Sequence, residues 1–167
     1  DQEDPEVFND YGYCLFLQGK LDHAELALLK AVSLSPRNPR FLNNLGMVLR
    51  LLGETRKGPR TLEQSVAAFQ NALAERSRER TPMEWAMTQN NLGAALQSLG
   101  KRAGDTYLLE ESAKAYEHAL QEITREKAPM SWAMTLANLA AVRMILAERT
   151  GSSDVALMAH VGYDLED

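Results

Sequence analysis

Two glycine–lysine pairs are the first residues whose spacing suggests chemistry. They occur as Gly12…Gly19-Lys20 and Gly93…Gly100-Lys101, and a glycine followed by a glycine–lysine pair also occurs in phosphate-binding loops. Such a loop requires four residues between its glycines and a serine or threonine after the lysine. Here six residues separate the glycines, and Leu21 or Arg102 follows the lysine. The two pairs therefore predict no nucleotide site.

The other reactive side chains form no catalytic arrangement either. The histidines His23, His118 and His160 stand alone and make no metal-binding pair at helical spacing. Neighbouring acids such as Glu110-Glu111 point to different faces of a helix and will not share a proton. We therefore expect no enzyme activity, no cofactor and no metal. The single cysteine, Cys14, excludes an internal disulfide, and its apolar neighbours favour a buried, inert thiol.

The composition is that of an ordinary folded, soluble protein with no excess of positive charge. The 167 residues suit one domain, 1–167, and 45% of them are apolar. A net charge of −5 argues against nucleic acid as a partner, because phosphates attract cationic surfaces. No apolar run reaches the ~18 residues of a membrane span, so we expect no membrane insertion. The chain opens at Asp1 without methionine, which indicates a processed or excised segment and leaves a lost leader open. The lone cysteine suits a reducing compartment, and a cytoplasmic location is expected.

Small residues that follow a large one recur along the chain at a fixed period. The steps between them are 34, 47 and 47 residues. A second set of glycines steps by 34 and 47 residues, and the two tryptophans lie 47 apart. Such periods predict a stack of like helical units. The three sets are Gly12, Gly46, Gly93 and Ala140; Gly19, Gly53 and Gly100; and Trp85 and Trp132.

The first unit shows what the period encodes. Apolar residues three and four apart mark two amphipathic helices, and Gly19 between them supplies a helix stop. The residues are Phe8, Tyr11-Gly12, Leu15, Ala24, Leu28, Ala31 and Pro36. This pattern resembles the tetratricopeptide repeat, whose period is about 34 residues. The resemblance implies an all-α, right-handed superhelical solenoid of four helix–turn–helix repeats, at about 5–38, 39–81, 82–128 and 129–167.

The two longer units carry 13 additional residues each. Counting from the glycine of the first helix places seven of them in the turn, at 53–59 and 100–106, and six near the helix ends at 77–83 and 124–130. The phrase at Arg78–Gly93 resembles the extended repeats of bacterial multi-repeat signalling proteins, and that similarity covers residues 62–150. It implies, as an alternative function, a regulatory or sensing module excised from such a protein.

Helix starts agree with the repeat. Asp4, Asn38 and Thr81 each precede a proline at the first helical position, and Thr81 with Glu84 predicts a capping box, whereas Ala128-Pro129 lacks a capping side chain. Eight helices are expected, at 5–18, 21–34, 39–52, 60–77, 82–99, 106–125, 129–148 and 154–165.

The small residues on the period are interpreted as core contacts. Gly12, Gly46, Gly93 and Ala140 are expected where the first helix of a unit touches the second closely. Leu28, Phe69 and Tyr116 are expected to fill the adjacent space. Trp85 and Trp132 are interpreted as buried between units rather than as an aromatic cage.

The surface expected to bind a partner is the concave face, which the first helices of a helical solenoid line. Asparagine is a mediocre helix former, so its recurrence there indicates a role, and its amide can bond to a peptide backbone. An equal alternative is that these asparagines bond to neighbouring helices. The predicted groove residues are Asn9, Tyr13, Asn43, Asn44, Met47, Arg50, Asn90, Asn91, Gln97 and Asn138.

The leading function is therefore a protein-interaction scaffold that binds a protein or peptide in this groove. A small-ligand or secreted-peptide receptor is a third class. The chaperone-tail binders of this family clamp a carboxylate with lysine and asparagine; here Asn9 stands in place of the lysine and only Asn44 matches, so that ligand is not expected. The apolar residues of 154–165 predict either further repeats or a homo-oligomer through the terminal helix.

Overall fold

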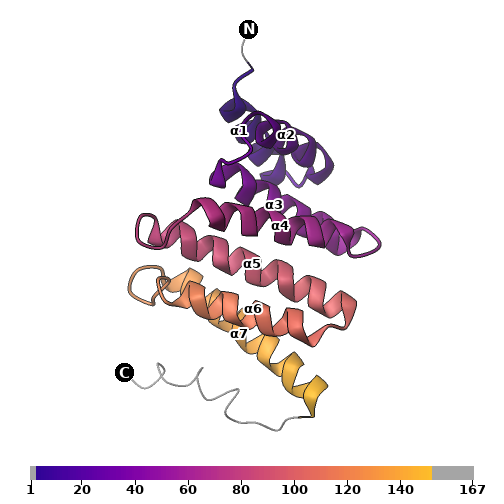
Figure 1. Ribbon diagram of the computed structural model, residues 1–167, viewed down its shortest axis with the longest axis vertical. Helices are drawn as coiled ribbons and strands as arrows, with labels where there is room; N and C mark the ends of the chain where they lie inside the picture. Colours follow the sequence, from indigo (N-terminus) through magenta and orange to yellow (C-terminus); the bar gives the residue numbers. More distant parts are fainter. Residues whose placement is uncertain (1–2, 152–167) are drawn as a thin grey trace.

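The computed structural model describes residues 3–151, and within that range the chain is helical, with no β-strand (Figure 1). The all-α prediction is confirmed. Seven of the eight expected helices are observed, and the eighth, 154–165, lies outside the described residues. They are α1 (Pro5–Leu17), α2 (Leu21–Leu34), α3 (Pro39–Thr55), α4 (Arg60–Glu75), α5 (Pro82–Ala103), α6 (Thr106–Leu120) and α7 (Pro129–Thr150).

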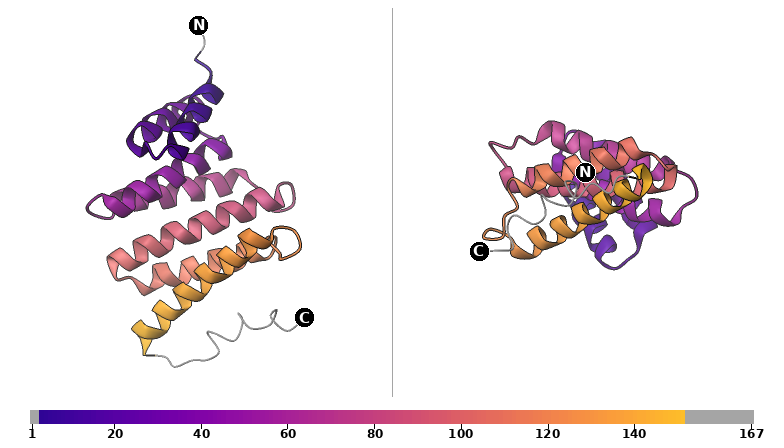
Figure 2. Two further views of the ribbon diagram at one scale, coloured as in Figure 1. Left: turned by 180° about the vertical axis from the view of Figure 1, so that it is seen from behind. Right: turned by 90° about the horizontal axis from the view of Figure 1, so that it is seen from below.

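Consecutive helices fold back on one another and stack in chain order along the long axis of the molecule (Figures 1 and 2). The hairpins are α1–α2, α3–α4 and α5–α6, and α7 packs on α6. The first helices α1, α3, α5 and α7 also contact one another in sequence, so they form one layer of the stack. This layer brings residues about one period apart to neighbouring positions.

Side-chain caps account for several helix starts. Asp4 Oδ1 accepts a hydrogen bond from Glu6 N at 2.9 Å, and Asn38 Oδ1 accepts one from Arg40 N at 3.0 Å. The predicted capping box at Thr81 is wrong. The Thr81 hydroxyl instead donates to the Ser77 carbonyl at 3.3 Å, so the preceding turn takes the group that would have capped α5.

The predicted close contacts of three glycines are confirmed. A Cβ on Gly12 would lie 2.7 Å from Leu28 Cγ, and one on Gly46 would lie 2.7 Å from Phe69 Cε1. A Cβ on Gly93 would lie 2.9 Å from Tyr116 Cδ1. Each large side chain is fully buried beneath the glycine of its own hairpin. The absence of a Cβ therefore sets how closely the two helices approach.

Gly53 and Gly100 are not helix stops, contrary to their alignment with Gly19. Gly19 has a φ of 72° and ends α1, whereas Gly53 and Gly100 lie inside α3 and α5. A Cβ on Gly53 would lie 2.7 Å from Leu62. The additional residues therefore lengthen the first helices before the turns begin, and the left-handed glycine after α5 is Gly104, with a φ of 71°.

Two other helix ends also differ from expectation. α4 ends at Glu75 and α6 ends at Leu120, which is five residues before the predicted end at 125. Ile123 lies in the turn that follows α6 and is buried with Ala86 and Ala119, and this cluster contacts Trp85 and Trp132. Both tryptophans are half-buried, in agreement with packing between units.

Arginines of α5 and α7 donate to backbone carbonyls of the preceding first helix or of the turn that follows it. Arg102 Nη1 donates to the carbonyls of Gly53 and Gly58, the latter at 2.9 Å, and its Nη2 donates to the Glu54 carbonyl at 3.1 Å. Arg149, 47 residues later, donates to the Gly100 carbonyl at 3.4 Å. The Gly53 and Glu54 carbonyls lie in the last turn of α3, where carbonyls lack intrahelical partners, so Arg102 supplies donors from the following unit. The Gly100 carbonyl also accepts the backbone N–H of Asp105 at 3.0 Å, so Arg149 adds to a cap that α5 already has.

The expectation that the Cys14 thiol is buried is wrong. Cys14 is exposed, because α1 is the first helix described and no other described helix covers that face.

α7 is 22 residues long, with a mean hydropathy of 1.4 over 18 residues, so by length and composition alone it could cross a membrane. A single such helix is weak support for a membrane segment, since core helices can have the same composition.

Candidate functional site

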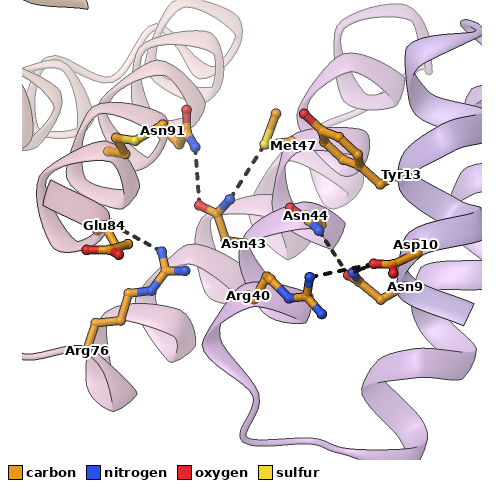
Figure 3. A pocket seen from close by; sticks show the side chains of 11 residues that line it. Asn9, Asp10, Tyr13, Arg40, Asn43, Asn44, Met47, Arg76, Glu84 and Asn91 are labelled. Atoms are coloured by element: carbon orange, nitrogen blue, oxygen red, sulfur yellow. Dashed lines mark hydrogen bonds and ion pairs between the residues drawn. The ribbon is translucent and has the colours of Figure 1, made fainter. Parts of the chain in front are cut away.

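A hollow of about 380 Å³ crosses the layer of first helices (Figure 3). α1, α3 and α5 each contribute side chains, and Arg76 enters from the end of α4. Six of the ten predicted groove residues line it, so the structure brings them together from three helices. The full lining is Asn9, Asp10, Tyr13, Arg40, Asn43, Asn44, Met47, Arg76, Glu84, Met87 and Asn91.

The helical period explains why these side chains meet. Residues three or four apart lie on one face of a helix. Asn9 and Tyr13 therefore share a face of α1, as Met87 and Asn91 share one of α5. On α3, the row of Arg40, Asn43, Asn44 and Met47 lies between them. Because the three helices stack side by side, their rows join into one surface.

The asparagines of neighbouring first helices hydrogen-bond to one another. Asn44 Nδ2 donates to Asn9 Oδ1 at 2.9 Å, and Asn91 Nδ2 donates to Asn43 Oδ1 at 3.2 Å. The bonding to adjacent helices that the sequence left as an equal alternative is therefore present. These hydrogen bonds fix the orientation of the amides. Asn9, on α1, faces α3 and is only 1% exposed.

These bonds do not use all the capacity of the amides. An asparagine amide offers two donors and one acceptor oxygen. Among residues 3–151, the Oδ1 atoms of Asn44 and Asn91 accept no side-chain or backbone donor. Both residues are half-buried and line the hollow. Each amide thus has hydrogen-bonding groups available toward the hollow.

Four predicted groove residues lie outside the hollow. Asn90 Oδ1 accepts from Thr135 Oγ1 at 3.0 Å, which continues the inter-helix bonds toward α7. Gln97 accepts from the Tyr116 hydroxyl at 3.3 Å, and Arg50 forms an ion pair with Glu54. Asn138 is half-buried on α7. Three of these four side chains are engaged within the protein, which leaves Asn138 on α7 beyond the lining.

Two cations and two carboxylates, Arg40, Arg76, Asp10 and Glu84, line the hollow, so its net charge is close to zero. Arg40 forms ion pairs with Glu6 and Asp10. Arg76 is half-buried; its Nη1 donates to the Glu84 carbonyl at 3.1 Å and to the Thr88 hydroxyl. Burial lowers the pKa of Arg76, and the nearby Glu84 carboxylate acts in the opposite direction. The guanidinium remains charged at neutral pH and is held in place by α5.

Sequence reasoning did not identify Asp10, Arg40, Arg76, Glu84 and Met87 as lining residues. A signal for two of them was present, because Arg40 and Met87 precede Asn44 and Asn91 by four residues and share their helix faces. Arg76 could not be found in this way. It belongs to the end of a second helix and reaches the first-helix layer only through the packing of α4 on α5.

The hollow combines apolar contact area with oriented hydrogen-bonding groups. Tyr13, Met47 and Met87 provide apolar contact area beside oriented amides. Among the described residues, no three His, Cys, Asp or Glu side chains lie close enough together to hold a metal ion. In comparisons with known proteins, no protein-family model and no curated protein matches this chain.

Proposed function

We propose that this protein is an interaction scaffold of the tetratricopeptide type, in which the hollow across α1, α3 and α5 binds a peptide segment of a partner protein. The stacked helices would then be a right-handed superhelix of four repeats. The observation that carries the proposal is the row of half-buried amides, Asn44 and Asn91, beside exposed apolar side chains in one hollow.

The chemistry of the lining favours a neutral or weakly charged peptide. Amides can donate to and accept from a peptide backbone, whereas Tyr13 and Met87, which are 40% and 53% exposed, can cover apolar side chains. Cations and carboxylates are both present at the rim, so neither a strongly acidic nor a strongly basic segment is favoured. The volume also falls within the ~300–1,000 Å³ typical of ligand pockets.

Selection from a random peptide-display library tests the proposal. Selected peptides would be synthesised, and their affinities measured by fluorescence anisotropy against the wild-type chain and the variants Tyr13→Ala and Met87→Ala. Each truncation removes apolar contact from an exposed side chain, so we expect affinity to fall about tenfold, equivalent to ~1.4 kcal/mol. Far-UV circular dichroism should be unchanged.

Tyr107→Ala is the matched control. Tyr107 is 62% exposed on α6, outside the hollow, so its loss should leave the affinity of a groove peptide unchanged. Peptides that bind Tyr13→Ala and Met87→Ala as tightly as the wild-type chain would show that the hollow is not the binding site.

A further inference from the structure

The two arginines that line the hollow differ in their partners. Arg40 forms ion pairs with the carboxylates of Glu6 and Asp10. Arg76 forms no ion pair with any residue of 3–151, and its Nη1 donates to a backbone carbonyl and a hydroxyl of α5, which are neutral acceptors. The charge of Arg40 is therefore compensated within the protein, whereas that of Arg76 has no counter-ion in the described part of the chain.

This lack of a counter-ion sets Arg76 apart from the other arginines that the structure describes. Four of them are buried or half-buried, and each of the other three contacts at least one carboxylate. Charged groups removed from water are ordinarily paired, because their desolvation is costly. A half-buried cation that is unpaired and lines a hollow therefore indicates a place for an anionic ligand group. The three paired arginines are Arg50 with Glu54, Arg56 with Asp22 and Glu25, and Arg143 with Glu117.

The Arg76 guanidinium also has unused donors. A guanidinium carries five N–H groups in one plane. Nη1 is engaged with α5, whereas Nε and Nη2 donate to no protein group within residues 3–151. The side chain extends from the end of α4 into the lining of the hollow (Figure 3). Two neighbouring N–H groups of a guanidinium can bind both oxygens of one carboxylate, so Arg76 can hold such a ligand in a fixed orientation.

The free protein bears a cost that an anion would remove. Burial lowers the pKa of Arg76, which means that its surroundings disfavour the charged form, and the Glu84 carboxylate offsets this effect only in part. An opposite charge within ~4–6 Å favours the charged form of a group. Binding of an anion to Arg76 therefore relieves a penalty that is present before the ligand arrives.

The other charges of the hollow favour an anion with a single negative charge. Asp10 and Glu84 also line the hollow, and their carboxylates repel any anion that enters. A phosphate group carries about −1.5 to −2 charges at neutral pH, so it would meet more repulsion than a carboxylate would. A carboxylate has one negative charge and two oxygens that match the spacing of the guanidinium N–H groups.

Given the proposed function of the hollow as a peptide site, on which this step rests, we propose that the hollow selects peptides with one carboxylate, which forms an ion pair with Arg76. An apolar residue of the same peptide then contacts Tyr13 or Met87. The cation comes from the end of a second helix, so this site differs from the clamp of lysine and asparagine that the chaperone-tail binders use. One acidic group also agrees with a weakly charged ligand.

A double-mutant cycle tests the ion pair. The probes are short random peptides displayed with their C-termini fused to the carrier, so that only side chains supply peptide carboxylates. A selected peptide with one Asp or Glu is synthesised with an amidated C-terminus, together with its Asn or Gln analogue. Fluorescence anisotropy gives the Kd of both peptides for the wild-type chain and for Arg76→Gln. A second library with free C-termini tests the other source of a carboxylate, and there the amidated peptide serves as the analogue.

The wild-type chain should bind the carboxylate peptide about tenfold more tightly than its amide analogue. Arg76→Gln should bind the two about equally, because the carboxylate has lost its counter-ion. Arg80→Gln is the matched control. Arg80 is exposed and does not line the hollow, so this variant removes the same charge from a nearby position, and the ratio of about tenfold should persist.

A ratio that stays at tenfold in Arg76→Gln would overturn the inference, since the carboxylate would then bind elsewhere. Equal affinities of the two peptides for the wild-type chain would overturn it as well. Tyr13→Ala separates these results from a failure of the proposed function. A peptide that loses affinity for Tyr13→Ala but shows no preference for the carboxylate would keep the hollow as the peptide site and remove only the role of Arg76.

Discussion

Gly46 lies directly against the ring of Phe69, and an added Cβ would come within 2.7, 2.8 and 2.9 Å of Cε1, Cζ and Cδ1. Two effects oppose each other in Gly46→Ala. Alanine is the better helix former by ~1 kcal/mol, whereas overpacking a tight crossing costs ~1–3 kcal/mol. Because three atoms of a rigid, buried ring would have to move, we expect overpacking to prevail, with a net loss of up to about 2 kcal/mol in the free energy of unfolding. Urea denaturation measures this difference.

The Phe69→Ala background is the control for that substitution. Without the ring, Gly46→Ala should be neutral or stabilising, because only the helix propensity remains. A penalty that persists in the double variant would show that overpacking against Phe69 is not its cause.

Asn44→Ala should destabilise the protein by about 1 kcal/mol, since it removes the donor to the buried Oδ1 of Asn9. The sequence alone left two roles open for this amide, contact with a partner or a bond to the neighbouring helix. The inter-helix bonds make a change in melting the expected result. Thermal denaturation followed by circular dichroism measures it, with Asn71→Ala, on the exposed surface of α4, as control. Equal melting temperatures for both variants would contradict the structural role.

Arg102→Met should lower the free energy of unfolding by about 1 kcal/mol, because it removes several hydrogen bonds to carbonyls near the end of α3. Methionine retains the length and apolar stem of the side chain. Arg102→Lys should recover only part of the loss, because one ammonium cannot reach carbonyls as widely spaced as a guanidinium can. Urea denaturation compares the three proteins. A lysine variant as stable as the wild type would indicate that the positive charge, and not the set of spaced guanidinium N–H donors, provides the stabilisation.

Acid should weaken the contact between Arg78 and Glu122. The Arg78 hydrogen bond, at 2.7 Å, holds the pKa of Glu122 below its usual value of 4.5. A carboxyl whose pKa is lower in the folded state contributes stability above its unfolded pKa, and this contribution is lost as the pH falls through the folded pKa. Glu122→Gln should therefore show a smaller decrease in urea midpoint than the wild type between about pH 7 and about pH 3.

The control for the acid experiment is Glu126→Gln. Glu126 is exposed and forms no ion pair within the part of the chain that the structure describes, so the wild-type pH dependence should persist. If both glutamine variants behave alike, the ion pair does not contribute to the acid sensitivity.

The period predicted the helices and their close contacts well, because both depend on local spacing. Gly12, Gly46 and Gly93 could be interpreted correctly since a glycine within an apolar helical pattern needs a packing reason. The expectation for Gly53 and Gly100 was wrong because it was based on a different signal. Their alignment with Gly19 suggested helix stops, yet the decisive contacts are with Leu62 and Leu109, which lie on the following helices.

The candidate site was harder to predict, because it depends on contacts between units. The sequence identified Asn44 and Asn91 on one face, but it could not decide whether the amides bond to a ligand or to the next helix. Two other features also depend on how the helices stack. Arg76 reaches the hollow because α4 packs on α5, and Cys14 is exposed because no described helix packs on that face of α1.

The direction of the arginine contacts has a consequence for synthesis on the ribosome. Arg102 and Arg149 lie almost 50 residues after the carbonyls to which they donate. Since translation proceeds from the N-terminus, α3 emerges before Arg102 exists, whereas α5 carries a local cap because the Asp105 N–H donates to the Gly100 carbonyl. The last turn of α3 therefore gains these donors only after α5 has left the exit tunnel, and until then water must hydrogen-bond to its carbonyls.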